Sequence, residues 1–239
     1  MITAQAIRFT DNVPAMQRFC EALGLAASVT SGDGWAVMRS SSGDVLLHST
    51  ADAVSKIVPG QTDLTFETDD LDRLAAEFEV TPVDEAFGRS LSLTDPLGDV
   101  LLVNETQTDF YGYSEHDAQP DPAVAVCPVR FTDPSGPYAE FLRRLGLRGE
   151  AAGDSAFVAF AADHGTVGLH VARPGEFEQY LTGAEGARVH LTFTTSGDPE
   201  ALAATLQDQG YAVRIDTTFG TMLEIEDPDG QKVQVHAVG

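Results

Sequence analysis

Hydrophobic and polar positions alternate in short runs along this chain, and residues that favour turns bound most runs. The clearest run covers residues 231–236, where Val233 and Val235 alternate with polar side chains. This alternation predicts a half-buried strand with one apolar face. The run follows Asp227-Pro228-Asp229-Gly230, in which the Pro and the Gly favour a reverse turn. We therefore expect a strand that starts immediately after a tight turn.

A longer period appears near the N-terminus. Met16, Phe19 and Leu23 recur at helical spacing, and Asn12 can cap the first turn, which predicts a helix over residues 13–23. Alternating or apolar runs predict strands around it at 2–10, 27–30, 35–39 and 44–49. Together they form one βαβββ unit.

The same features recur later in the chain. Ile7-Arg8-Phe9-Thr10-Asp11 is matched 122 positions later by Val129-Arg130-Phe131-Thr132-Asp133. The reverse turn at 227–230 has its counterpart in Asp95-Pro96-Leu97-Gly98, at an offset of 132. Because the offset grows between elements and not within them, the chain is interpreted as two diverged copies of one fold.

Each copy contains two βαβββ units. The second unit is expected to have a strand at 63–68, a helix from Leu71 to Phe78 and strands near 80–83, 88–94 and 99–104. Helices are expected near 137–145 and 199–209 in the second copy. The predicted organisation is a first domain over 1–105, a linker rich in Asp, Gln and Pro over 106–123, and a second domain over 124–239.

Composition limits the classes of function. The chain has 239 residues and a net charge of −23, which disfavours nucleic-acid binding and favours a cationic ligand. It contains no apolar run long enough to span a bilayer and no signal-peptide pattern, so a cytoplasmic protein is expected. Cys20 and Cys127 occupy unrelated places in the repeat and are read as free thiols.

The run Val-Pro-Ala-Met-x-x-Phe-x-x-x-Leu-Gly-Leu at 13–25, its weaker counterpart at 141–147 and the two Asp-Pro-x-Gly turns resemble the vicinal oxygen chelate superfamily. That superfamily includes glyoxalase I, bleomycin-resistance and fosfomycin-resistance proteins and extradiol dioxygenases. The resemblance implies an α+β fold of four βαβββ units in two domains, with cup-shaped mixed sheets and helices outside.

The resemblance also implies where a divalent metal would bind. Family ligands are a His or Gln on the first strand of a unit and a Glu on the last strand, four residues after the turn Gly. Leu102 and Gln234 occupy the Glu positions that close units two and four, and Asp63 and His190 occupy their first strands. At the ends of units one and three the Glu positions hold Leu46 and Gly168, and His48 and His170 lie two residues later on the same face. A neutral amide binds such metals less well than a carboxylate does.

Two registers are open for the first strand of each copy. Counting back from the helix Phe places Gln5 and Cys127 at the ligand position. Strand alternation instead turns Arg8 and Arg130 into the cup, with Ile7 and Phe9, or Val129 and Phe131, toward the helices. The arginine register is preferred, because a guanidinium buried under a helix without a partner would be costly. In the unit that opens at His190, alternation sends Leu191 and Phe193 to the helices and His190, Thr192 and Thr194 to the cup.

The candidate ligand-binding residues are Arg8, Trp35, His48, Asp63, Arg130, His170, His190 and Gln234. No metal is favoured. If Zn, Ni, Fe or Mn is bound, its ligands would be His190 and Gln234 together with His170, Cys127 or Gln5. If the copies instead pair across the chain, unit one meets unit four and the set becomes Gln5, His48, His190 and Gln234. The protein would be a monomer with internally paired domains or a homodimer.

Two functions follow from these positions. The first is metal-free sequestration of a flat or cationic small molecule in an acidic cup, similar to the bleomycin-resistance proteins and to antibiotic resistance of that kind. The alternative is a divalent-metal-dependent lyase, isomerase or dioxygenase that acts through the second domain, where the metal would serve as a Lewis acid. A structural or regulatory partner protein is a third possibility. No catalytic Ser motif, phosphate-binding loop or dinucleotide fingerprint is present.

Overall fold

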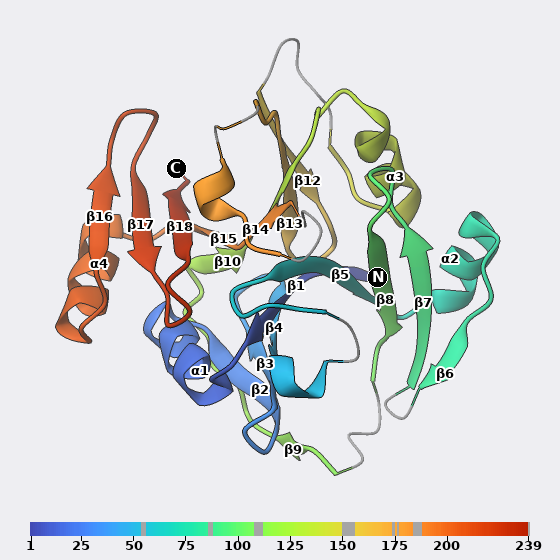
Figure 1. Ribbon diagram of the computed structural model, residues 1–239, viewed down its shortest axis with the longest axis horizontal. Coiled ribbons are helices and arrows are strands. Elements are labelled where there is room, and N and C mark those ends of the chain that lie inside the picture. The colour runs from blue at the N-terminus through green and yellow to red at the C-terminus, as the bar shows by residue number, and fades with distance from the viewer. Residues whose placement is uncertain are drawn as a thin grey trace.

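The computed structural model describes residues 1–53, 56–85, 88–107, 112–149, 156–173, 175, 177–183 and 188–238. Two halves follow one another along the chain (Figure 1). The first half contains β1 (Ile2–Thr10), α1 (Val13–Ala22), β2 (Ala26–Ser31), β3 (Trp35–Arg39), β4 (Asp44–Ser49), η1 (Thr50–Asp52), β5 (Thr62–Thr68), α2 (Leu71–Phe78), β6 (Val83–Glu85), β7 (Gly88–Thr94) and β8 (Val100–Glu105). These elements form the two expected βαβββ units.

The second half follows a similar order after β9 (Ser114–Glu115), but among its described residues α3 is followed by two strands where α1 and α2 are each followed by three. It contains β10 (Val124–Val126), β11 (Val129–Phe131), α3 (Pro137–Leu145), β12 (Phe157–Ala161), β13 (Thr166–His170), η2 (Glu178–Tyr180), β14 (Val189–His190), β15 (Thr192–Thr195), α4 (Pro199–Asp208), β16 (Val213–Asp216), β17 (Met222–Glu226) and β18 (Lys232–Ala237). The α+β class and the mixed sheets expected from the sequence are confirmed, because parallel and antiparallel pairs occur in each half.

Three sheets carry these strands. The first half forms one sheet in the order β6-β7-β8-β5-β1-β4-β3-β2-β9, and the second half forms the sheets β10-β15-β18-β17-β16 and β12-β13-β11-β14. The second half is divided because its first strands are interrupted, at Cys127-Pro128 between β10 and β11 and at Leu191 between β14 and β15. Pro128 has no backbone N–H to donate to a sheet ladder, which explains the first interruption.

Local signals in the sequence define the helix ends. The Asn12 side chain accepts a hydrogen bond from the Ala15 amide at 3.0 Å, and the Asp70 side chain does the same for Arg73 at 3.1 Å. Both satisfy amides that the first helical turn leaves without partners. Part of the expected linker has a different structure, because β9 pairs with β2 and extends the first sheet at its edge. Within the described residues, no helix combines the length and apolar character of a membrane span.

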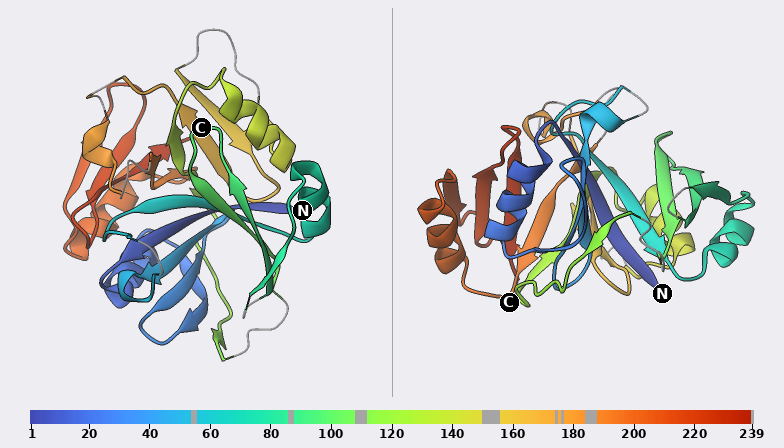
Figure 2. Two further views of the ribbon diagram at one scale, coloured as in Figure 1. Left: turned by 45° about the vertical axis from the view of Figure 1, so that its right-hand side comes forward. Right: turned by 90° about the horizontal axis from the view of Figure 1, so that it is seen from below.

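The helices lie on one face of each sheet and bring the two halves together. One buried cluster joins α1 residues such as Phe19 to α4 residues such as Leu206, and a second joins Leu74 of α2 to Phe141 of α3. Figures 1 and 2 show α2 and α3 side by side, and the rings of Phe78 and Phe141 meet edge to face at 5.5 Å. Unit one therefore shares its core with unit four, and unit two shares its core with unit three.

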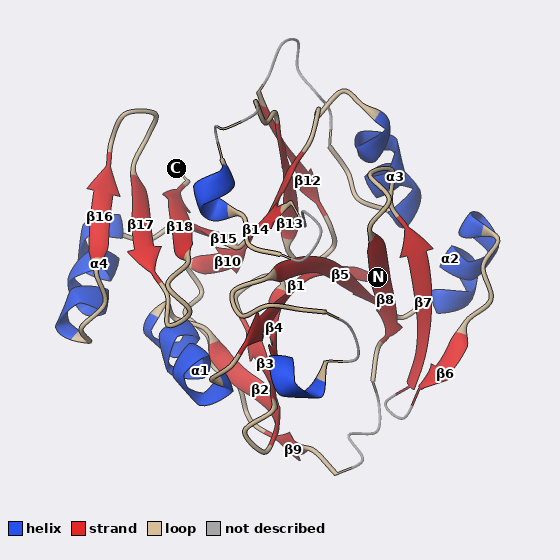
Figure 3. Cartoon of the chain, viewed as in Figure 1, coloured by secondary structure: helices blue, strands red, loops and turns tan. Residues whose placement is uncertain are grey.

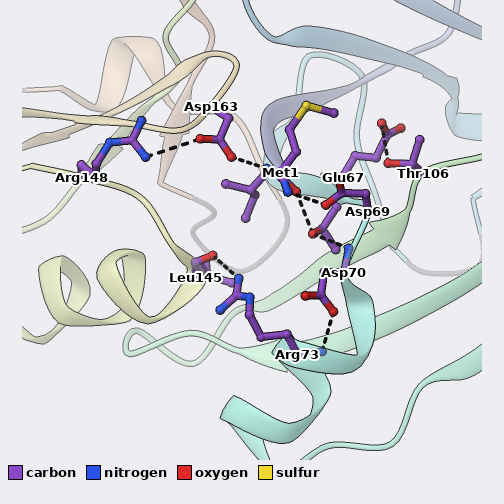
Figure 4. A network of polar contacts seen from close by, with 11 residues as sticks. Met1, Glu67, Asp69, Asp70, Arg73, Thr106, Leu145, Arg148 and Asp163 are labelled. Atoms are coloured by element: carbon purple, nitrogen blue, oxygen red, sulfur yellow. Dashed lines mark hydrogen bonds and ion pairs between the residues drawn. The ribbon is translucent and has the colours of Figure 1, made fainter.

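Polar contacts reinforce the junction near α2 and α3 (Figure 4). The Ile2 amide donates to Asp163 at 2.9 Å, and Arg73 donates to the Leu145 carbonyl at 3.2 Å. Among the described residues, no α-helix lies on the opposite face of each sheet, and we call this face the helix-free face. Figure 3 shows the short helices η1 and η2 near the strands, apart from α1, α2, α3 and α4.

Candidate functional site

The site begins with the alternation of β14 and β15. Leu191 and Phe193 are buried in the cluster that holds α1 and α4. His190 and Thr192 consequently point to the helix-free face, as the alternation predicts. Thr192 lies opposite Gln234 in the parallel pair of β15 and β18. The fold thus brings His190, at the end of β14, and Gln234, on β18, to one face, although β14 and β18 belong to different sheets and the two residues are far apart in the sequence.

His190 is held tightly on this face. Only 3% of the residue is exposed, and its Nε2 lies 2.7 Å from the Lys232 carbonyl oxygen. A carbonyl oxygen only accepts hydrogen bonds, so Nε2 carries the proton. Burial lowers the pKa of His190 from its ordinary value to about 4. The imidazole is therefore neutral at physiological pH.

Tyr180 of η2 covers His190 from the other side. The two rings are stacked with centroids 4.8 Å apart. The Tyr180 hydroxyl donates to Glu224 Oε2 at 3.0 Å and also interacts with the Gln234 side chain. Burial and the neighbouring Glu224 carboxylate raise the pKa of Tyr180. Tyr180 consequently links His190, Gln234 and Glu224 into one group.

Further rings extend this group into a continuous surface. Phe131 stacks on Phe177 with centroids 4.5 Å apart and an interplanar angle of 13°, and His170 lies 5.0 Å from Phe177. Phe157 contacts His170 at 6.1 Å and is 44% exposed. We call this surface the aromatic face; its members are Phe131, Phe157, His170, Phe177, Tyr180 and His190. It offers stacked rings at the base and an accessible ring at the edge.

Charge on the aromatic face is already compensated. The Glu224 carboxylate lies 3.2 Å from Lys232 Nζ and 3.3 Å from Arg214 Nη2. Its remaining interaction is with the Tyr180 hydroxyl. The acidic cup expected from the net charge is therefore not found at this point of the second half.

The side chains at the family metal positions do not fit a divalent metal. His190 Nε2 is bonded to a carbonyl, and Gln234 interacts with Tyr180. Burial raises the pKa of Cys127 to about 12, so its thiol stays protonated and is a poor ligand. Within the described residues, no three His, Cys, Asp or Glu side chains come together in a way that could hold a metal ion.

The first half differs on its helix-free face. Leucines occupy both positions that would supply a Glu ligand in this half. Leu46 is 5% exposed and Leu102 is 42% exposed. Asp63 accepts hydrogen bonds from Gln61 at 3.1 Å. Burial raises the pKa of Asp63, as it does for Asp44 and Glu67 on the same face. Gln5 donates to Asp44 at 3.3 Å, so this half contains hydrogen-bonded carboxyls where the family has ligands.

The preferred register of the first strands is wrong. Ala4 and Ala6 of β1 belong to the helix-side clusters, and Arg8 follows them on that face. Its guanidinium is 3% exposed and donates to Asp227 and to Thr62. Arg130 is equally buried and donates to Asp95 at 2.8 Å. Neither arginine faces a ligand, because each has an acidic partner in the other half that the sequence alone did not identify.

The alternative register describes the strands correctly. Gln5 and Cys127 lie on the helix-free side, as do Phe9 and Phe131. Units one and two share the pair β1 and β5, while units three and four share β11 with β14 and β10 with β15. Gln5 and His48 therefore lie in the sheet of the first half, whereas His190 and Gln234 lie in the two sheets of the second half, and the cross-chain set is not assembled.

The structure adds residues that the sequence did not single out. Phe177 and Tyr180 come from the segment after β13, which has no periodic pattern. Glu224 lies on β17, inside an apolar run. No local signal in the sequence distinguishes these three residues. The packing of η2 brings Tyr180 onto His190, and the pairing of β17 with β18 places Glu224 beside the Tyr180 hydroxyl.

Comparison with known proteins agrees with this geometry. Catechol 2,3-dioxygenase matches with a TM-score of 0.62 and 14% identity over 99% of this chain and 87% of the other. The Mn(II)-bound glyoxalase from Novosphingobium aromaticivorans matches with a TM-score of 0.62 and 14% identity over 98% and 80%. This chain has the vicinal oxygen chelate fold.

A third structure extends the range of that fold. A mutant of 4-hydroxymandelate synthase from Streptomyces coelicolor matches with a TM-score of 0.58 and 17% identity over 98% of this chain and 91% of the other. No protein-family profile matches the sequence. No curated protein matches it either. The likeness therefore concerns the fold and leaves the activity to be argued from the site.

Proposed function

We propose that this protein binds a flat aromatic small molecule on the aromatic face of its second half, without using a metal. The observation that supports this is the continuous set of ring contacts from Tyr180 through Phe131 to Phe157. Phe157 is 44% exposed, so one end of the set is accessible to a ligand. Aromatic rings gain by stacking beyond the apolar area that they bury.

Charge has a secondary part in this proposal. The net charge of −23 would attract a cation over long distances. At the face itself Glu224 is paired with Arg214 and Lys232, so it offers no free carboxylate. Ring shape is therefore expected to matter more than ligand charge. The alternative hypothesis is a metal-dependent lyase, isomerase or dioxygenase. It would require the side chains of His190, Cys127 and Gln234 to be free to bind a metal.

The proposal is tested with two planar probes. Acridine is neutral and 9-aminoacridine is cationic at neutral pH, and both are fluorescent. We expect both to bind, with affinities within about tenfold of each other. Binding is followed by fluorescence anisotropy of the probe and by calorimetry.

Matched variants locate the binding. Phe157→Ala and Tyr180→Ala each remove a ring from the aromatic face and should weaken binding about five- to tenfold. Phe219→Ala serves as the control, because Phe219 is 100% exposed and makes no ring contact among the described residues. Equal affinity in Phe157→Ala, Phe219→Ala and the wild type would contradict the proposed site.

A further inference from the structure

Three rings form a row on the helix-free face of the first half. Phe9 of β1 lies opposite His48 of β4, and His48 lies opposite Trp35 of β3. The centroid of the His48 ring is 5.5 Å from that of Phe9 and 5.5 Å from that of Trp35. The strand register therefore brings three rings from three neighbouring strands into contact.

The second half contains the same row 122 positions later. Phe131 lies opposite His170, and His170 lies opposite Phe157. The ring centroids are 6.0 Å and 6.1 Å apart. The row of the second half is thus the edge of the aromatic face, and the first half preserves its geometry with a Trp in place of Phe157.

The central histidine has the same orientation in both rows. His48 Nδ1 lies 2.7 Å from the Ser49 carbonyl oxygen, and His170 Nδ1 lies 2.7 Å from the Val171 carbonyl oxygen. Because a carbonyl only accepts, Nδ1 carries the proton in each neutral ring and Nε2 presents a lone pair. No hydrogen-bond partner of either Nε2 is found in the part of the chain that the structure describes.

The two rows differ in what covers them. In the second half Phe177 stacks on Phe131 at 4.5 Å. The segment 50–61 that follows β4 has no aromatic residue, so it cannot place a ring over Phe9 in the same way. Trp35 and His48 are both partly exposed. Phe9 is only 6% exposed, so it forms the base of the row, and Trp35 and His48 offer ring surface and an acceptor nitrogen to a molecule from solution.

We infer that the row Phe9, His48 and Trp35 is a second binding site, which takes a planar aromatic ring bearing an N–H or O–H donor. The ring would stack on Trp35, and its donor would bond to His48 Nε2. The equivalent row in the second half would impose the same requirement through His170. This inference goes beyond the proposed site, because it adds a site in the other half and specifies the donor. The first-half site stands on its own geometry even if the aromatic face of the second half binds nothing.

Trp35 makes the first-half site directly observable. It is the only tryptophan in the chain, so emission excited at 295 nm reports on this row alone. The probe is benzimidazole, which is planar, has one N–H and absorbs little at that wavelength. Its control is 1-methylbenzimidazole, which has the same ring system and no N–H. Calorimetry in parallel reports the total number of sites.

We expect benzimidazole to change Trp35 emission at pH 8 in the wild type and equally in Phe157→Ala, with two sites by calorimetry in the wild type. The methylated probe should bind about fivefold more weakly, because one hydrogen bond is lost. His48→Phe keeps a ring and Trp35 but removes the acceptor, so it should abolish the preference between the probes. Circular dichroism checks that this variant folds, and the probe pair on the wild type tests the donor requirement independently.

Each outcome decides between the two sites. If Trp35 emission stays constant while calorimetry shows one site that Phe157→Ala weakens, the first-half inference is overturned and the proposed function stands. If Trp35 responds and Phe157→Ala leaves the calorimetry unchanged, the first-half site stands and the proposed function fails. Equal affinity for the two probes at Trp35 would overturn the assignment of His48 as the acceptor.

Discussion

Arg8 of the first half donates a hydrogen bond from Nη2 to Oδ2 of Asp227 in the second half. The side chains of Arg8 and Asp227 are 3% and 0% exposed, so the pair is enclosed where the halves meet. Asp227 also accepts the amides of Asp229 and Gln231, at 3.0 Å and 2.8 Å, within its own turn. The equivalent turn residue Asp95 accepts from Arg130 at 2.8 Å. Each copy thus uses the arginine that occurs at the same place in both copies to bind the Asp-Pro-x-Gly turn of the other copy.

Removing Arg8 should strongly destabilise the protein. Arg8→Met leaves Asp227 buried without its partner, and the free energy of unfolding should fall by about 3–5 kcal/mol in chemical denaturation. Arg143→Met is the control, because Arg143 is exposed and its contacts, an ion pair with Glu140 at 3.5 Å, a hydrogen bond to the Gly149 carbonyl at 3.2 Å and a ring contact with Phe160, all lie at the surface of α3. It should cost under about 1 kcal/mol. In a double-mutant cycle, Arg8→Met combined with Asp227→Asn should cost less than the sum of the single changes. Strict additivity would contradict a coupled pair.

His190 should make stability depend on pH. Its pKa is about 4 in the folded protein, against an ordinary value near 6.5, because burial disfavours the imidazolium. The stabilisation from the neutral ring is complete above pH 6.5 and is lost as pH falls from 6.5 to 4, by roughly 3 kcal/mol in total. His190→Gln should show a shallower fall in unfolding free energy over this range. Parallel pH profiles for the two proteins would refute the assignment.

Replacing Glu67 by Gln and replacing Glu105 by Gln should change the stability of the protein in opposite directions. Burial raises the pKa of Glu67, so its carboxyl group binds a proton more tightly in the folded state than in the unfolded state. The free energy of unfolding therefore falls as pH rises through the raised pKa. Glu67→Gln should therefore be more stable than the wild type at pH 7, with a gain that shrinks on acidification. The hydrogen bond from Arg89 lowers the pKa of Glu105, so Glu105→Gln should be less stable at pH 7. Thermal melts between pH 4 and 8 measure both, and equal signs would contradict the prediction.

Metal removal should leave the protein unchanged. Because the donors at Cys127, His190 and Gln234 are protonated or bonded within the protein, EDTA treatment should not shift the melting temperature. Gln234→Glu adds a carboxylate beside His190 and should bind Zn or Ni more tightly than the wild type does in calorimetric titrations. Stoichiometric metal in untagged wild-type protein, or a lower melting temperature after EDTA, would instead favour a metal-dependent enzyme.

The sequence by itself determined the repeat, the helix and most of the strands of each of the four units, and the faces of the most regular strands. These features depend on near neighbours: capping by Asn12 and Asp70, reverse turns at Asp95 and Asp227, and alternation around Leu191 and Phe193. The tertiary structure alone decided the register of β1 and β11. The residue patterns of these strands are compatible with either face pointing to the helices. The observed register depends on the hydrogen bond between Arg8 and Asp227, which are 219 positions apart. The tertiary structure also decided the site. Tyr180 reaches His190 because η2 packs on β14 and β18. The local pattern of residues around Tyr180 gives no signal for this contact.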